Sequence, residues 1–132
     1  MACIFCDHIK AEQILCQTKH FKVVYDINPI QTGHLLLISK EHYNSLTQLP
    51  QEVRHDLIDL EYQLVQQLEE QLPIDGVTRA SNDKDLLDTE THFHTHLIPR
   101  VKEDGFWDKL EIEKINFDLE TVEDNLNTIT SG

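Results

Sequence analysis

The sequence predicts an α+β fold in which an antiparallel sheet packs against one long helix, with a short helix near the N-terminus. Two observations predict this class. Residues 51–72 carry apolar side chains at spacings of three and four, which is typical of an amphipathic helix. Short apolar segments bounded by turn residues lie before and after this helix, as strands do. Strands on both sides of a single helix favour an antiparallel sheet over alternating βαβ units.

The composition narrows the class of protein. The chain has 132 residues, which fits one domain with a real core. No apolar segment approaches the roughly 20 residues of a membrane helix, and the N-terminus lacks the pattern of a secretory signal, so we expect a cytoplasmic protein. A net charge of −13 disfavours nucleic acid as a partner. A phosphate ligand would therefore need local donors such as histidines and backbone N–H groups.

The first third of the chain is expected to contain a short helix followed by a hairpin. Residues 3–13 suit the helix. Residues 14–17 and 21–27 suit two strands, because each is apolar and a turn at residues 18–19 separates them.

A loop, a buried strand and the long helix are expected next. Residues 28–33 form the loop, which Asn-Pro opens and Gly33 closes. Residues 34–39 are a short apolar run, typical of a buried strand. Pro50 suits the start of the helix, and Pro73 ends it. The apolar stripe of the helix consists of Val53, Leu57, Leu60, Leu64, Leu68 and Leu72.

Two strands and a tail complete the prediction. Residues 76–81 and 91–99 read as strands, joined by a polar loop. We expect a domain over residues 1–105 and an acidic C-terminal tail, residues 106–132, that packs on the domain or extends it. The side chains expected to make that packing are Phe106, Trp107, Ile115 and Phe117.

The stretch "ETHFHTHLIPR" places His92, His94 and His96 at alternate positions. In a strand the three side chains share one face, about 6–7 Å apart, while the residues between them face the core. A histidine-rich solvated strand and a catalytic metal site are two interpretations. In a third, the middle imidazole is a nucleophile. Neutral imidazole attacks phosphorus, and its neighbours donate hydrogen bonds to the oxygens.

The three cysteines do not suit a disulfide framework, since their number is odd. Cys3 and Cys6 form a C-x-x-C pair, which fits half a metal site, a redox pair or two ordinary buried cysteines. Cys16 stands alone and is expected to be a small buried hydrophobe.

Three segments, "CIFC", "YDINPIQTGHLLLISKEHY" and "HFHTHLIPR", together resemble the histidine triad (HIT) nucleotide hydrolases and transferases, in particular the Hint-like bacterial branch. The resemblance covers about residues 3–100 and implies an α+β fold and a homodimer. It implies that His94 attacks the α-phosphorus of a purine nucleotide conjugate and forms a nucleotidyl-histidine, which water hydrolyses. The conjugate would be a phosphoramidate, an acyl-adenylate or a dinucleoside polyphosphate. His96 would contact the phosphate and assist proton transfer.

The same resemblance divides the triad between two sites. Bacterial members of this branch hold zinc with the cysteine pair, a histidine after the glycine loop and the first triad histidine. Two thiolates and two imidazoles make a closed tetrahedral set, as in structural zinc sites. The corresponding ligands for Zn²⁺ are Cys3, Cys6, His42 and His92.

Nucleotide-binding residues also follow from the resemblance. Asp26 matches an Asp that contacts ribose hydroxyls, although an Asp before a turn could equally be a local cap. Ile27 and Phe5 would line the base pocket. His34 matches a further family histidine near the triad, or it is a satisfied core group.

The loop before the triad departs from the family pattern. Asn82 lies one residue closer to the triad than usual, the family glycines are missing, and Asp88 replaces a Gln. Thr89 fills the Ser/Thr position. Thr95 replaces an apolar residue, for which we expect little effect. The altered loop supports an alternative function, a nucleotide-binding or partner-docking module with weak or no catalysis.

Overall fold

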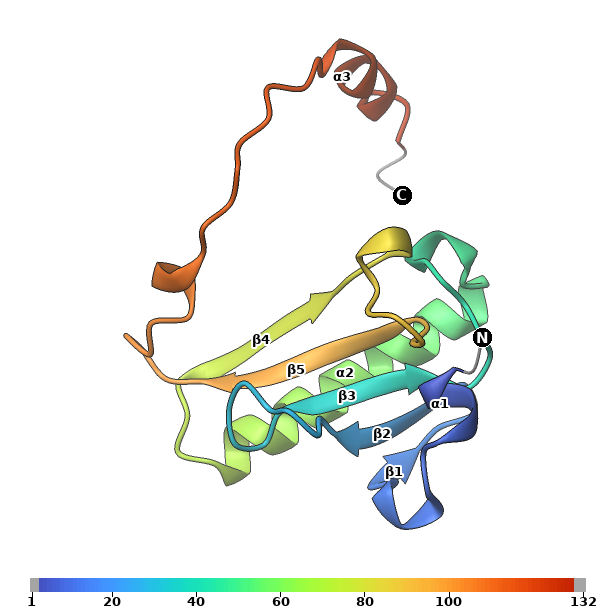
Figure 1. Ribbon diagram of the computed structural model, residues 1–132, viewed down its shortest axis with the longest axis vertical. Helices are drawn as coiled ribbons and strands as arrows, with labels where there is room; N and C mark the ends of the chain where they lie inside the picture. The colour runs from blue at the N-terminus through green and yellow to red at the C-terminus, as the bar shows by residue number, and fades with distance from the viewer. Residues whose placement is uncertain (1–2, 130–132) are drawn as a thin grey trace.

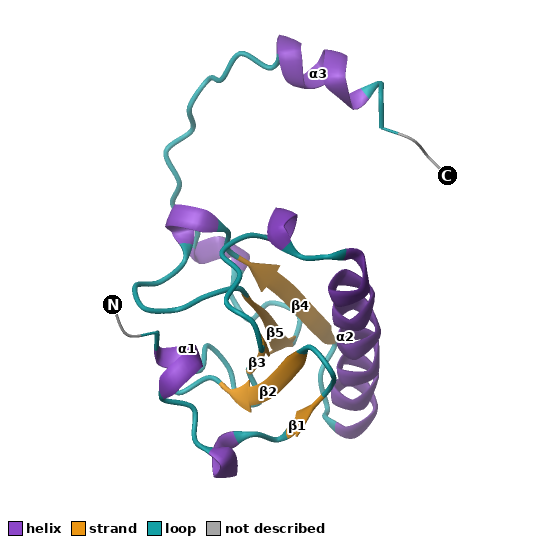
Figure 2. Cartoon of the chain, turned by 90° about the vertical axis from the view of Figure 1, so that its right-hand side faces the viewer, coloured by secondary structure: helices purple, strands orange, loops and turns teal. Residues whose placement is uncertain are grey.

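The structure is a computed structural model that describes residues 3–129. One five-stranded sheet with the order β1-β2-β3-β5-β4 forms its centre, and every pair of neighbours is antiparallel. Figures 1 and 2 show α2 along one face of this sheet and α1 on the other side. The strands are β1 Cys16–Gln17, β2 Phe21–Tyr25, β3 Leu35–Ser39, β4 Gly76–Ser81 and β5 His94–Arg100. The α-helices are α1 Ile4–Asp7, α2 Gln51–Gln71 and α3 Glu120–Leu126, and single 3₁₀ turns span Ala11–Gln13, Leu46–Gln48, Lys84–Leu86 and Trp107–Lys109. The predicted α+β class is confirmed.

The N-terminal part differs from the prediction in detail. The hairpin forms, but the helix expected over residues 3–13 is two separate short helices. The expectation that Cys16 is buried is wrong. It lies on a two-residue strand at the edge of the sheet, where both side chains are exposed.

The long helix α2 forms where its periodicity predicts it. Its residues Val53, Leu57 and Leu60 are buried in a core cluster with Phe21 and Phe93, and Leu64 and Leu68 pack against that cluster. The last expected residue of the stripe, Leu72, instead lies beyond the helix in an extended conformation and is 37 % exposed. Pro73 follows it directly, which restricts Leu72 to extended backbone.

Gly33 closes the loop before β3 for a steric reason. Its φ is +88°, a conformation that side chains rarely adopt, and an added Cβ would lie 3.3 Å from Cγ of Pro99. The close approach ties this loop to β5.

Strand β5 starts at His94, three residues later than predicted. Phe93, just before the strand, bonds to the last residue of β3 and to the loop that follows β3. The Phe93 N–H donates to the carbonyl of Tyr43 at 2.6 Å, and the Phe93 carbonyl accepts from the Ser39 N–H at 3.2 Å. The backbone is still extended enough that Phe93 points into the helix-side core while His92 and His94 point away from it.

The tail beyond β5 lies away from the sheet (Figure 1). Phe106 is half-buried under the guanidinium of Arg100, whose Cζ lies 4.4 Å from the ring centroid. Trp107, Ile115 and Phe117 are more than 60 % exposed, so the packing expected of them is not found among residues 3–129. Among residues 3–129, no helix is long and apolar enough to cross a membrane.

Candidate functional site

A pocket of about 300 Å³ lies on the face of the sheet opposite α2. His94 and His96 of β5 project into it, and Phe5 of α1 packs edge-on against His94, with ring centroids 4.8 Å apart. The two triad rings are closer than the strand rise predicts, since their centroids are 4.9 Å apart. Other residues that line the pocket include His8, Asp26, Ile27, Asp88, Thr89 and Thr91.

The backbone fixes the tautomer of His94. Its Nδ1 lies 2.7 Å from the carbonyl oxygen of His92, which only accepts hydrogen bonds. Nδ1 therefore carries the proton, and the lone pair of a neutral ring is on Nε2. The ring is 4 % exposed, and its burial lowers the pKa of His94. A neutral imidazole with one free lone pair is the form that acts as a nucleophile.

His34 fixes His96 in the opposite tautomer. The Ile30 N–H donates to Nδ1 of His34 at 3.1 Å, so the proton of a neutral His34 is on Nε2. That Nε2 lies 2.9 Å from Nδ1 of His96 and donates to it. Burial, followed by the neighbouring histidines, lowers the pKa of His96 to about 4, which keeps it neutral. His96 therefore carries its proton on Nε2 and is a hydrogen-bond donor.

Asp26 forms the local cap that the sequence allowed, and it also lies at the pocket. Its Oδ1 accepts from the Asn28 N–H at 2.8 Å, which is a local turn cap, and the residue also lines the pocket. Its Oδ2 lies 3.5 Å from Nε2 of His34. Ile27 also lines the pocket and is 81 % exposed.

Asp26, His34 and His96 are close enough together to suggest a metal site. The hydrogen bonds favour a different explanation. Nδ1 of His34 is occupied by the Ile30 N–H, and the proton on Nε2 lies between the two rings. The nitrogens that face each other thus share a proton, so this cluster orients His96 rather than presenting lone pairs to a metal.

The four residues with the ligand types of a zinc site converge at the other end of the triad. Their ligand atoms all lie within 4.8 Å of one another, and they are Cys3, Cys6, His42 and His92. Sγ of Cys3 is 3.1 Å from Nδ1 of His92, and Sγ of Cys6 is 3.4 Å from Nδ1 of His42. Nε2 of His92 donates to the carbonyl of Ser39 at 2.6 Å, so its Nδ1 lone pair faces the thiols. This donor set fits Zn²⁺.

Several backbone groups that hold the site have no signal in the sequence. The Ile4 N–H donates to the carbonyl of Glu90 at 2.7 Å, and Lys22 donates to the carbonyl of Phe5 at 2.8 Å. These two bonds fix α1 above the triad. The amide of Ile30 and the carbonyl of Ser39 orient histidines in the same way, and any residue type except proline supplies a backbone N–H.

The altered loop contributes only part of what was expected. Asp88 and Thr89 line the pocket, whereas Asn82 is exposed and is not among the lining residues. The structure adds one observation on Thr95, for which we expected little effect. Its side chain is buried, and its hydroxyl has no hydrogen-bond partner among the described residues, which costs stability.

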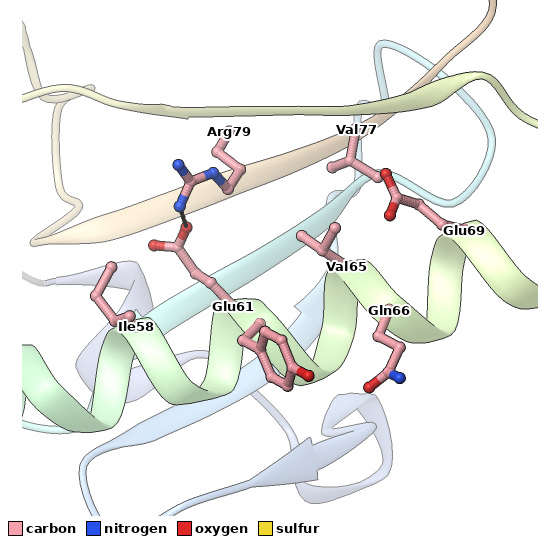
Figure 3. Close-up of a pocket in the computed structure, with 8 residues that line it drawn as sticks. Ile58, Glu61, Val65, Gln66, Glu69, Val77 and Arg79 are labelled. Atoms are coloured by element: carbon pink, nitrogen blue, oxygen red, sulfur yellow. Dashed lines mark hydrogen bonds and ion pairs between the residues drawn. The ribbon is translucent and has the colours of Figure 1, made fainter.

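A second concave surface lies between α2 and β4, away from the histidines. It is a cleft of about 450 Å³ in which Ile58, Val65 and Val77 surround an ion pair between Glu61 and Arg79, 3.1 Å apart (Figure 3). Exposed Tyr62 also lines it. β4 is the outer strand of the sheet. Its outer edge has no partner strand among the described residues and is available to pair with another chain.

An antiparallel sheet that presents His94 and His96 to a pocket, with His92 just before the same strand, defines a protein of the histidine triad class. The chain belongs to the HIT family, because residues 9–103 match the HIT domain. This is a family of nucleotide hydrolases and transferases.

Individual relatives agree with this assignment. The chain is 31 % identical to a HIT-like protein of Methanocaldococcus jannaschii over 88 % of this chain and 93 % of that protein. It is 33 % identical to the adenosine 5′-monophosphoramidase of Saccharomyces cerevisiae over 77 % of this chain and 65 % of that protein. The solved structure of a Zn-bound histidine triad family protein from Mycobacterium smegmatis superposes with a TM-score of 0.67 at 26 % identity and covers 96 % of both chains.

Proposed function

We propose that this chain cleaves nucleotide conjugates at the α-phosphate through a nucleotidyl intermediate on His94. The observation that carries the proposal is the hydrogen bond from Nδ1 of His94 to the His92 carbonyl, because it leaves Nε2 as a free lone pair at the pocket. The yeast relative named as a phosphoramidase supports this reaction type.

The proposed reaction has two displacements. Nε2 of His94 attacks the α-phosphorus, the P–N bond forms, and the bond to the leaving group breaks with that group taking up a proton. Water then attacks the same phosphorus, loses a proton to solvent and releases the nucleoside monophosphate as the P–N bond breaks. The Nε2–H of His96 donates to a phosphate oxygen on which charge develops. His34 is a positioning residue, since it acts only through His96.

The remaining pocket residues are proposed to hold a purine nucleotide. Asp26 would accept from ribose hydroxyls, while Phe5 and Ile27 line the place of the base. Thr89 would donate to the phosphate. Asn82 is not among the residues that line the pocket, so we assign it no contact with the nucleotide.

We also propose a structural Zn²⁺ held by the two thiols and two imidazoles. When bound, the ion supplies a cross-link with no catalytic step. The ligands come from the N-cap of α1, from α1 itself, from the loop after β3 and from the residue before Phe93, so the four bonds would fix the N-terminus beside the triad. Elemental analysis should give one zinc per chain, and the Cys6→Ser variant should lose it. Full zinc content in that variant would contradict this ligand set.

A second copy of the chain is the proposed occupant of the cleft between α2 and β4. Two β4 edges can pair antiparallel about a twofold axis, which makes the contact self-complementary and extends the sheet. The same axis would bring Ile58 and Tyr62 of the two copies together, and both side chains are exposed in the single chain. Light scattering should give the mass of a dimer, and Tyr62→Arg should shift it toward the monomer. A monomeric wild-type protein would refute this contact.

The test of the catalytic proposal is intact-protein mass spectrometry after mixing with adenosine phosphoramidate. The expected result is a mass increase of one adenylyl group that maps to His94, together with release of AMP. Binding in a calorimeter without AMP formation and without an adduct would contradict the proposal. It would favour the nucleotide-binding module instead.

A further inference from the structure

The charge of the pocket is unusual for a site that receives a phosphate. Its lining includes two carboxylates, Asp26 and Asp88, and no lysine or arginine among the described residues. The chain as a whole also has a net charge of −13. A substrate that brings several negative charges would therefore be repelled both at the site and over the whole surface.

The two carboxylates differ in how they are used. Asp26 caps a turn through Asn28 and lies beside the His34 ring. The carboxylate of Asp88 makes no hydrogen bond or ion pair with any described residue, and the side chain is exposed at the pocket. Its charge is thus available to a ligand.

The backbone holds Asp88 at this position. Its carbonyl accepts from both the N–H of Thr91 at 3.2 Å and the hydroxyl of Thr91 at 2.7 Å. Glu90, between them, has a φ of +68°, which turns the chain back on itself. The Glu90 carbonyl in turn accepts from α1. Asp88 is therefore part of an ordered turn that borders the triad.

Asp88 lines the same pocket as His94 and His96. Burial lowers the pKa of His96, and the charge of Asp88 is among those that oppose this shift. A charge that acts on an imidazole in the pocket also acts on a leaving group bound in the same pocket.

We propose that Asp88 selects conjugates whose leaving group carries a positive charge, namely nucleoside phosphoramidates in which the leaving amine bears a second, ammonium group. This inference rests on the proposed function. The P–N bond to the amine breaks as the bond to Nε2 of His94 forms, and the departing nitrogen takes a proton from water. The ammonium at the far end of the amine lies against the Asp88 carboxylate. A polyphosphate leaving group would place added negative charge at the same position.

Three substrates test this selectivity in the full-length protein. They are the adenosine phosphoramidates of 1,4-diaminobutane and of pentylamine, which have similar length and differ in the terminal charge, and diadenosine tetraphosphate. The wild-type protein should prefer the diamine conjugate over the alkylamine conjugate by about tenfold in kcat/KM, which is about 1.4 kcal/mol. It should be slowest on the polyphosphate. Added salt should reduce the preference.

The Asp88→Asn variant removes the charge and keeps the shape. Its ratio of kcat/KM for the two phosphoramidates should fall close to one, and its relative rate on the polyphosphate should rise. Asp85→Asn, in the same loop but outside the pocket lining, is the matched control and should keep the wild-type ratio. The ratio is the readout because a purely structural effect changes both substrates by the same factor.

Two results would overturn the inference. One is an unchanged ratio in Asp88→Asn. The other is a loss of polyphosphate cleavage in that variant only when Mg²⁺ is present, which would mean that Asp88 binds a metal-complexed polyphosphate. Failure of the proposed function is distinguishable, since the wild-type protein would then release no AMP from any of the three conjugates and form no adduct on His94. That result would also remove the basis for selectivity.

Discussion

Burial has different consequences for the side chains on the two faces of β5. Leu97, together with Phe93 just before the strand, lies on the helix side and is almost completely buried among apolar residues. His94, on the open side, is nearly as buried, but its neighbours are another imidazole and the Phe5 ring. Burial of an apolar side chain stabilises the fold, whereas burial of an imidazole destabilises its charged form. Alternate residues of one segment thus bury apolar side chains on one face and imidazoles on the other.

The largest expected effect is on turnover, and it comes from a substitution on the open face of β5. His94→Gln removes the proposed nucleophile, and turnover of adenosine phosphoramidate should fall by roughly 10⁴-fold or more. Stability should change little in comparison, because the side chain lies outside the apolar cluster on the helix side. Steady-state kinetics and urea unfolding measure the two quantities. A variant that keeps a tenth of the wild-type kcat would disprove the role of His94.

A substitution on the helix side of β5 should lower stability and leave activity nearly unchanged. Leu97→Ala opens a cavity in the helix-side core and should cost about 2–5 kcal/mol of unfolding free energy. The folded protein should keep its specific activity within a few-fold, as measured below the unfolding transition. Leu86→Ala is the control, since this side chain is 74 % exposed and should change stability by less than about 0.5 kcal/mol. Equal losses in the two variants would argue against the core described here.

The pH dependence of stability tests the open face. The pKa of His96 is near 6.5 when unfolded and about 4 when folded. Between these values the unfolded chain binds a proton that the folded chain does not. Stability is therefore fully present above pH 6.5 and declines as the pH falls toward 4, with a slope from this one group of up to about 1.4 kcal/mol per pH unit.

Urea unfolding at a series of pH values measures that slope. His96→Gln should reduce it, and part should remain because burial also lowers the pKa of His34. If the variant and the wild-type protein lose stability in parallel from pH 6.5 to 4, His96 is not the desolvated group that the structure indicates.

The smallest expected effect concerns a polar group on the apolar face. Thr95 alternates with His94 and His96, so its buried, unpaired hydroxyl lies on the helix side. Thr95→Val removes that hydroxyl at nearly constant shape and should raise the unfolding free energy by about 1 kcal/mol. Thr78→Val is the matched control and should lower it, because Thr78 Oγ1 accepts from Arg100 at 2.9 Å. A loss of stability in Thr95→Val would mean that its hydroxyl has a partner.

Several features of this protein follow from local sequence patterns. Spacings of three and four gave the long helix within one residue at its end, since a helical period repeats along the chain itself. Alternation placed His94 and His96 on one face and Leu97 on the other. The mistaken burial of Cys16 depends on neighbours in space. Cys16 is exposed because its strand is at the edge of the sheet, and nothing in its own sequence states which strand has no outer neighbour.

The chemistry of the site depends on contacts that only the tertiary structure determines. His34 and His96 are 62 residues apart in the sequence, and Cys3 and His92 are 89 apart. Pairing of β3 with β5 brings the first pair together, and the turn before β5 together with α1 aligns the second. By itself, the sequence determined which residue types were available and which face each would occupy. The tautomers of His94 and His96 depend on backbone groups of His92 and Ile30, whose positions are fixed only when the chain has folded.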